Sequence, residues 1–139
     1  MCLVAFAFGV SGDYPMIFAA NRDEHHARPT AAAHWWTESQ HILGGRDLLA
    51  GGTWLAVDQL GRLAAVTNVP SPSGATYTKS RGHLVNDYLA GEAPAQEFIS
   101  SLQDVPQDYW PYNLLLFDGV DFPYLNNQNA PQKPSPGVN

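Results

Sequence analysis

The chain has 139 residues, a formal net charge of −6 and 45% hydrophobic residues, which is enough for one domain with a real core. The acidic balance argues against nucleic acid or an anionic membrane as the main partner, because both require clustered lysine and arginine. A single cysteine, Cys2, excludes an intramolecular disulfide framework. We see no secretory signal, and the apolar run of residues 2–10 is too short to span a bilayer. We therefore expect a soluble, cytoplasmic protein.

Three hairpins are predicted from short apolar runs that turn residues separate. The strand pairs are residues 2–10 with 16–20, 53–57 with 62–67, and 112–117 with 122–125. Gly12, Gly61 and Gly119 supply the turns, because glycine adopts backbone angles that other residues avoid.

Two helices are predicted between the second and third hairpins. Ser80 suits the N-cap of a helix over residues 81–90, Gly91 suits its end, and Pro94 suits the first turn of the next helix. The apolar faces are expected to consist of Leu84, Val85, Tyr88 and Leu89 in the first helix and Phe98, Ile99 and Leu102 in the second.

The remaining segments are predicted to lack regular structure. A loop follows Pro29, and residues 34–36 and 42–43 are interpreted as covering one side of the core. Residues 126–139 are polar and proline-rich, with nothing that packs as an element. Hairpins, then helices, then another hairpin indicate an α+β fold.

Cys2 follows Met1 directly and is the first candidate catalytic residue. Removal of Met1 leaves the thiol and a free α-amine on the same residue. An α-amine has a reference pKa of about 7.7–8.0, so it acts as a base near neutral pH. Cys2 then supplies both a nucleophile and its own general base. The alternative interpretation is a small buried residue that opens a strand.

The densest polar cluster is Asn21-Arg22-Asp23-Glu24, at the end of the second predicted strand. Antiparallel pairing with the first strand predicts that Arg22 and Asp23 lie beside Cys2. There a guanidinium favours the thiolate, and a carboxylate holds the α-amine. The alternative interpretation is a solvated charged turn that closes the hairpin.

Asn68 ends the strand that precedes Val69-Pro70 and is a candidate oxyanion donor. An amide that points into a pocket stabilises a developing oxyanion by roughly 3–4 kcal/mol in known hydrolases. Alternatively, an asparagine two residues before a proline begins a turn.

The sequence predicts neither a metal nor a cofactor. The adjacent His25 and His26 diverge, and the other histidines show no ligand spacing. No glycine-rich nucleotide loop and no GxSxG motif is present.

A series of short motifs runs along the chain: Met1-Cys2, Asn21-Arg22-Asp23-Glu24, Arg28-Pro29-Thr30, Gly45-Arg46-Asp47, Ala50-Gly51-Gly52-Thr53-Trp54-Leu55, Gly61-Arg62, Thr67-Asn68 and Ser80-Arg81-Gly82. In this order they resemble the NRDE protein family, also called the transport and Golgi organisation protein 2 family. The resemblance covers essentially the whole chain, and the number of motifs makes it specific.

The resemblance implies an N-terminal-nucleophile-hydrolase-like fold, an αββα sandwich, with more distant similarity to choloylglycine hydrolases and penicillin acylases. Those enzymes use an N-terminal cysteine, an arginine and an aspartate after the second strand, and an oxyanion-hole asparagine. Cys2, Arg22, Asp23 and Asn68 fall on the matching positions. Arg22 and Asp23 are adjacent here, whereas those enzymes have a spacer between the two.

Family members continue well past residue 137. We therefore expect residues 1–125 to be the N-terminal part of a single domain, residues 126–139 to be a tail, and the sandwich to be incomplete. Eukaryotic members are linked to secretion and Golgi organisation, to lipid or acyl-CoA handling and to haem trafficking. The resemblance leaves two functions open. One is a cysteine amidohydrolase or acyltransferase that acts on a small amide or acyl substrate. The other is a non-catalytic carrier of haem or of an acylated hydrophobic ligand.

Overall fold

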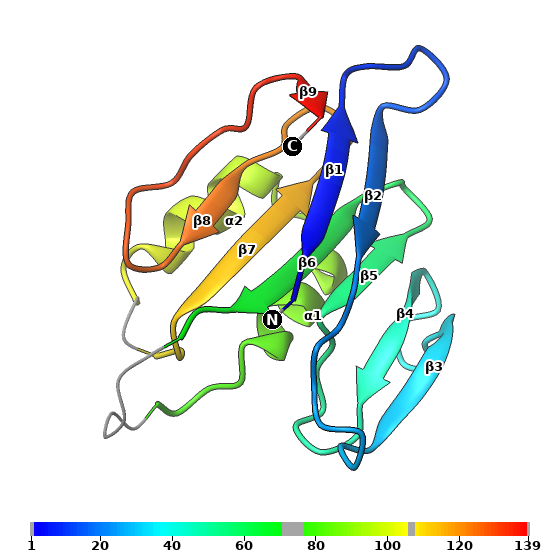
Figure 1. Ribbon diagram of the computed structural model, residues 1–139, viewed down its shortest axis with the longest axis vertical. Coiled ribbons are helices and arrows are strands. Elements are labelled where there is room, and N and C mark those ends of the chain that lie inside the picture. The colour runs from blue at the N-terminus through cyan, green and yellow to red at the C-terminus, as the bar shows by residue number, and fades with distance from the viewer. Residues whose placement is uncertain (1, 71–76, 106–107, 139) are drawn as a thin grey trace.

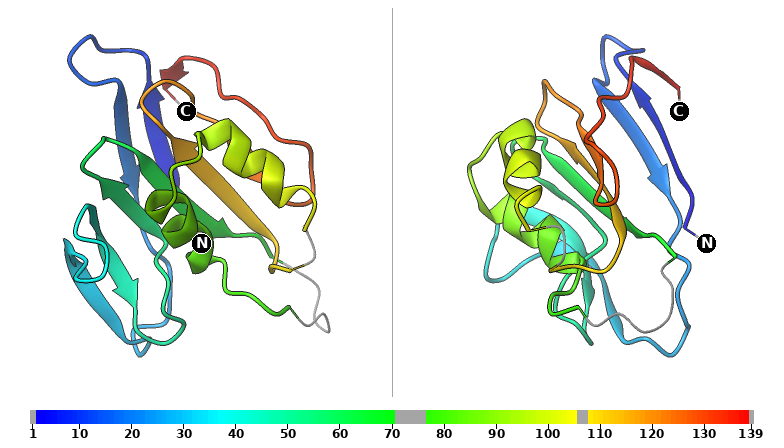
Figure 2. Two further views of the ribbon diagram at one scale, coloured as in Figure 1. Left: turned by 180° about the vertical axis from the view of Figure 1, so that it is seen from behind. Right: turned by 90° about the vertical axis from the view of Figure 1, so that its left-hand side faces the viewer.

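The computed structural model describes residues 2–70, 77–105 and 108–138, which form three layers (Figures 1 and 2). Two helices cover one face of a six-stranded sheet, and a three-stranded sheet lies against the other face. The predicted α+β class is confirmed. The elements are β1 (Val4–Phe8), β2 (Met16–Ala20), β3 (Thr30–Trp35), β4 (Ile42–Asp47), β5 (Leu55–Asp58), β6 (Leu63–Asn68), α1 (Gly82–Ala90), α2 (Ala95–Leu102), β7 (Tyr112–Phe117), β8 (Tyr124–Asn126) and β9 (Gly137–Val138).

The strand order is β3-β4-β5-β6-β7-β8 in the larger sheet and β2-β1-β9 in the smaller one, with antiparallel neighbours throughout. The three predicted hairpins are present as β1/β2, β5/β6 and β7/β8. In the middle hairpin the Gly61 N–H donates to the Asp58 carbonyl at 3.1 Å. Gly61 has φ +79°, a left-handed angle that glycine adopts without steric cost.

The pair β3/β4 lies where the sequence predicted a loop, so that part of the prediction is wrong, whereas Trp36 and Ile42 belong to the core under the helices, as predicted. Most of β3 is exposed, and β3 and β4 contain several alanine and glycine residues, which are weak strand formers. Neither segment therefore shows the alternation of apolar and polar residues that predicts a strand. Gly44 is nevertheless required in β4. A Cβ at this position would lie 2.7 Å from the Cβ of Ala56 on β5.

The predicted absence of structure after residue 126 is also wrong. Gly137–Val138 forms β9 on the free edge of β1, and Tyr124 exchanges two backbone hydrogen bonds of 2.8 Å with Gln132. Backbone groups can complete a sheet edge without apolar side chains, so composition did not reveal this pairing.

Both predicted helices are present, with the predicted apolar residues on the side that faces the larger sheet. Helix α1 begins at Gly82, without the predicted side-chain cap from Ser80, and Gly91 is its C-cap. Helix α2 begins one residue after Pro94. No described helix has the length and apolar character needed to cross a membrane.

Arg62 joins the end of α1 to the β5/β6 turn. Its guanidinium donates to the carbonyls of Leu89 at 2.7 Å and Gly91 at 2.8 Å. It also pairs at 2.6 Å with Asp58, whose side chain is fully buried. Backbone carbonyls at a helix C-terminus lack helical partners, so this cation satisfies them.

The pleat of β6 assigns its side chains alternately to the two cores. Ala64 and Val66 belong to the core under the helices, whereas Leu63 and Ala65 belong to the core between the sheets. Continuing the alternation brings Thr67 toward the smaller sheet, at the end of the strand where β1 begins.

Candidate active site

Strand pairing positions Cys2. Phe6 and Phe8 of β1 pack into the core between the sheets, and a period of two puts Cys2 on the same face. The pairing of β1 and β2 continues one residue beyond the strand ends, where the Asn21 N–H donates a hydrogen bond to the Leu3 carbonyl at 3.1 Å. One step further, the backbone N–H of Asp23 donates to Cys2 Sγ at 3.4 Å. The structure thus brings Cys2 and Asp23 into contact, as the pairing of the two strands predicts.

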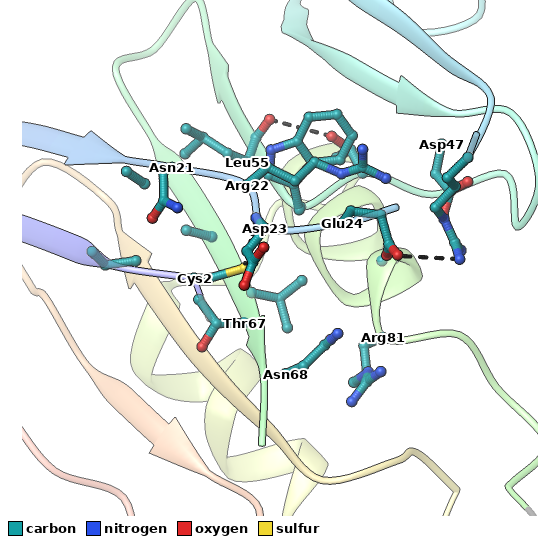
Figure 3. A pocket seen from close by; sticks show the side chains of 18 of the residues that line it. Cys2, Asn21, Arg22, Asp23, Glu24, Asp47, Leu55, Thr67, Asn68 and Arg81 are labelled. Atoms are coloured by element: carbon teal, nitrogen blue, oxygen red, sulfur yellow. Dashed lines mark hydrogen bonds and ion pairs between the residues drawn. The ribbon is translucent and has the colours of Figure 1, made fainter. Parts of the chain in front are cut away.

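Cys2, Arg22, Asp23 and Asn68 all line one cavity of about 140 Å³ (Figure 3). Cys2 and Arg22 are half-buried, whereas Asp23 and Asn68 are exposed. The cavity lies where the ends of β2 and β6 meet the start of β1 and of α1. Its other lining residues are Val4, Ala20, Asn21, Glu24, Arg28, Asp47, Thr53, Trp54, Leu55, Ala65, Val66, Thr67, Ser80, Arg81 and Gly82.

Arg22 contributes to the cavity wall through an aromatic contact. Its guanidinium carbon lies 4.3 Å from the ring centroid of Trp54, within the range of a cation–π interaction. The side chain points away from Cys2 in Figure 3. The sequence predicted a guanidinium beside the sulfur. The physical reason for the difference is the tryptophan face, which offers the cation an attractive partner on β5's side of the cavity.

A second wall is the ion pair of Arg28 and Asp47. One carboxylate oxygen accepts from Arg28 Nη2 at 2.6 Å and Nε at 3.1 Å. The other oxygen accepts hydrogen bonds from the backbone N–H groups of Leu49 at 3.0 Å and Ala50 at 3.3 Å. Burial works to raise the pKa of Asp47, but these hydrogen bonds outweigh it and lower the pKa below its usual value.

Arg81 enters the cavity from the residue that precedes α1. Its Nη1 donates to the Pro111 carbonyl at 2.9 Å. Burial lowers the pKa of Arg81 from its usual value, and the positive charge of Arg28 acts in the same direction, while Glu24 opposes both. The backbone here is tightly packed, since a Cβ on Gly52 would lie 2.5 Å from the carbonyl carbon of Gly82.

A larger cavity of about 450 Å³ lies between the sheets and shares Cys2, Val4 and Thr67 with the first. A hydrogen-bonded chain lines it. Asn113 Nδ2 donates to Thr67 Oγ1 at 3.1 Å, and the Tyr124 hydroxyl donates to Asn113 Oδ1 at 2.7 Å. The Cys2 thiol therefore lies where two cavities meet.

Sequence reasoning assigned no role to several lining residues. Arg28, Asp47, Trp54 and Arg81 all occur in the family motifs, and every motif except Gly61-Arg62 contributes a residue to the smaller cavity. The presence of these residues in the motifs was the sequence signal that they share a site. For Asn113 the sequence held no such signal, because only the register between β6 and β7 places it opposite Thr67.

Among the described residues, no group of three or more His, Cys, Asp and Glu side chains is arranged to hold a metal ion.

Comparison with known proteins identifies the family. The family model described as "Transport and Golgi organisation 2" matches residues 1–138. The human "Transport and Golgi organization protein 2 homolog" is 34% identical over 143 residues, which are 94% of this chain and 52% of the relative. The mouse "Transport and Golgi organization 2 homolog" is 32% identical over 144 residues, with 95% and 52% covered. The Drosophila melanogaster "Transport and Golgi organization protein 2" is 31% identical over 133 residues, with 87% and 46% covered.

The chain belongs to the Transport and Golgi organisation 2 family. The resemblance predicted from the motifs is confirmed. The chain spans about half the length of the curated relatives it matches.

Proposed function

We propose that the chain belongs to an N-terminal-cysteine hydrolase that cleaves an amide or related acyl bond, with Cys2 as the nucleophile. One observation carries this proposal. The half-buried Cys2 sulfur accepts a hydrogen bond from the Asp23 N–H at the junction of two cavities. The order of layers, helices on a sheet on a second sheet, supports assigning the fold to part of an αββα sandwich.

The proposed reaction has two stages. After removal of Met1, the α-amine of Cys2 accepts the thiol proton, and the sulfur forms a bond to the acyl carbon. The C–N bond then breaks, and the ammonium returns its proton to the departing nitrogen. Water attacks the thioester in the second stage, which releases the acid and restores the thiol.

Neighbouring residues have distinct roles in this proposal. Asn68 donates its amide to the oxyanion that forms on the attacked carbonyl. Asp23 holds the α-amine of Cys2, and its backbone N–H fixes the sulfur. Arg22, which stacks on Trp54, stabilises the wall beside them and adds positive charge to the cavity.

Two cavities suit the two sides of a scissile bond. The cavity of about 450 Å³ includes Phe6, Leu115 and Tyr124 and fits the less polar part of a substrate. The cavity of about 140 Å³ is charged and fits a small polar part.

The test is turnover of a panel of small acyl-amides by three forms of the protein. We expect activity from protein with a free Cys2 α-amine, and none from Cys2→Ala. Protein that retains an uncleaved N-terminal tag lacks the free amine and should also be inactive. Equal activity of the tagged and untagged forms would contradict the proposed base.

A carrier role without turnover is the second candidate. The larger cavity favours it, because its volume lies within the usual range of about 300–1,000 Å³ for small-molecule sites. The ligand in this case is a hydrophobic or acylated molecule, or haem. A ligand that binds Cys2→Ala as tightly as the unchanged protein, with no turnover by either, would favour the carrier.

A further inference from the structure

The guanidinium groups of Arg22, Arg28 and Arg81 line the smaller cavity. Their positive charges are not balanced equally by neighbouring carboxylates. Arg28 is neutralised by Asp47 at 2.6 Å, with Glu24 a further 3.8 Å contact. Asp47 uses both of its oxygens within the protein. The charges and most hydrogen-bonding groups of this pair are therefore already satisfied within the protein, so the pair contributes little to ligand binding.

Arg81 is different. It is half-buried, and among the described residues no carboxylate forms an ion pair with it. A guanidinium has five N–H donors, and the bond from Nη1 to the Pro111 carbonyl uses only one side of the group. Burial and the charge of Arg28 disfavour the cation more than Glu24 favours it, so an added anion would relieve an existing electrostatic cost.

The backbone holds Arg81 in place. The next residue, Gly82, accepts a hydrogen bond from the Thr53 N–H at 3.3 Å and lies so close to Gly52 that no Cβ fits between them. These contacts fix the backbone next to Arg81, and the bond to the Pro111 carbonyl restrains its side chain. A restrained side chain loses little conformational freedom on binding a ligand, which favours affinity. Figure 3 shows Asn68 between Cys2 and Arg81 in the same cavity.

We propose that Arg81 binds an anionic group, a carboxylate or a phosphate, on the acyl compound that Cys2 attacks. A guanidinium suits both anions, because its fork of donors meets two oxygens at once. The small cavity places this group near the reacting carbonyl. The identity of the reacting bond rests on the proposed function, but the anion site is a separate claim that binding alone can test.

The experiment measures binding calorimetrically in Cys2→Ala protein, where no reaction takes place. The probes are N-acetylglycine, its uncharged analogue N-acetylglycinamide, and inorganic phosphate. We expect an anionic probe to bind about tenfold or more tightly than the uncharged one, as for a charge-assisted hydrogen bond. Preference for N-acetylglycine identifies the group as a carboxylate, and preference for phosphate identifies it as a phosphate.

Variants then assign the effect to one side chain. Arg81→Gln should abolish the preference, whereas Arg81→Lys should keep part of it. Lys79→Gln is the matched control, because it removes one positive charge from an exposed side chain that pairs with Asp108. It should leave the preference unchanged.

Equal binding of charged and uncharged probes overturns the proposal, and so does a preference that survives in folded Arg81→Gln. If Arg81→Gln does not fold, Arg81→Lys and the comparison of probes still decide the question. Anion binding without turnover by the unchanged protein would count against the hydrolase and leave the anion site standing.

Discussion

The backbone N–H of Asp23 donates a hydrogen bond to Cys2 Sγ at 3.4 Å, across 21 residues of sequence. This contact depends on the register of β1 and β2, in which Val4 lies opposite Ala20 and Phe6 opposite Phe18. A slip of one residue would turn every side chain of a strand to the opposite face. The packing of the phenylalanines between the sheets therefore also positions the thiol.

Asn68→Ala should reduce turnover far more than stability. A lost oxyanion donor costs about 10²–10³ in rate. Asn68 is exposed, so its removal should cost less than about 1 kcal/mol of folding free energy. Steady-state kinetics and urea denaturation measure the two effects, with the exposed turn variant Gln59→Ala as control. A proportionate loss of stability and activity would make Asn68 a structural residue.

Gly52→Ala should destabilise the fold by about 1–3 kcal/mol, the usual cost of overpacking. The new Cβ would lie 2.5 Å from the Gly82 backbone, which cannot move without shifting Arg81. Gly12→Ala is the matched control, because no heavy atom lies within 4 Å of its added Cβ. Urea denaturation of both variants measures the difference. Equal stability of the two would show that the contact between Gly52 and Gly82 relaxes freely.

Arg62→Met should cost about 3–5 kcal/mol, because it leaves a buried carboxylate without its cation. The Asp58 side chain is fully buried, and Arg62 also satisfies carbonyls at the end of α1. The control is Lys133→Met, which breaks an exposed pair with Asp121 that is worth about 0–1 kcal/mol. Similar midpoints in urea for the two variants would contradict a structural role for Arg62.

The sequence predicted those elements that are short apolar runs bounded by turn residues or that show helical apolar spacing. The strands of β5/β6 and β7/β8 are such runs and are buried or half-buried along most of their length, and the apolar spacing of Leu84 and Tyr88 predicted the buried face of α1. Strand β3 was not predicted, because its alanines lie on an exposed edge of the sheet and give no apolar pattern. Strand β9 was not predicted either, because it pairs with β1 through backbone groups only.

The candidate site shows the same division. The proximity of Cys2 to Asp23 followed from hairpin pairing, which is a local rule. The orientation of Arg22 did not, because its partner Trp54 lies 32 residues later in the chain, just before β5. The position of Arg81 likewise depends on the fit between Gly82 and Gly52. Such contacts between distant segments leave no periodic signal in the sequence.

Stability should fall in acid partly through Asp47. Its pKa in the folded protein lies below the ordinary value of about 3.9 for an unfolded chain, so the unfolded state binds protons more readily. Its contribution is fully present above the unfolded pKa and is lost as the pH falls through the lower pKa of the folded protein. The stability gap between the unchanged protein and Asp47→Asn should therefore narrow from pH 7 to pH 3. A gap that urea denaturation finds independent of pH would contradict this linkage.

The most direct test of the central claim is mass spectrometry of the N-terminal peptide after brief exposure to an activated acetyl ester. We expect a peptide that begins at Cys2 and carries one acetyl group there. The folded protein should acquire this group much faster than urea-unfolded protein, and Asn68→Ala should slow its formation. A peptide that retains Met1, or a Cys2 acetylated no faster in the folded protein than in the unfolded one, would contradict the role of Cys2 as an N-terminal nucleophile.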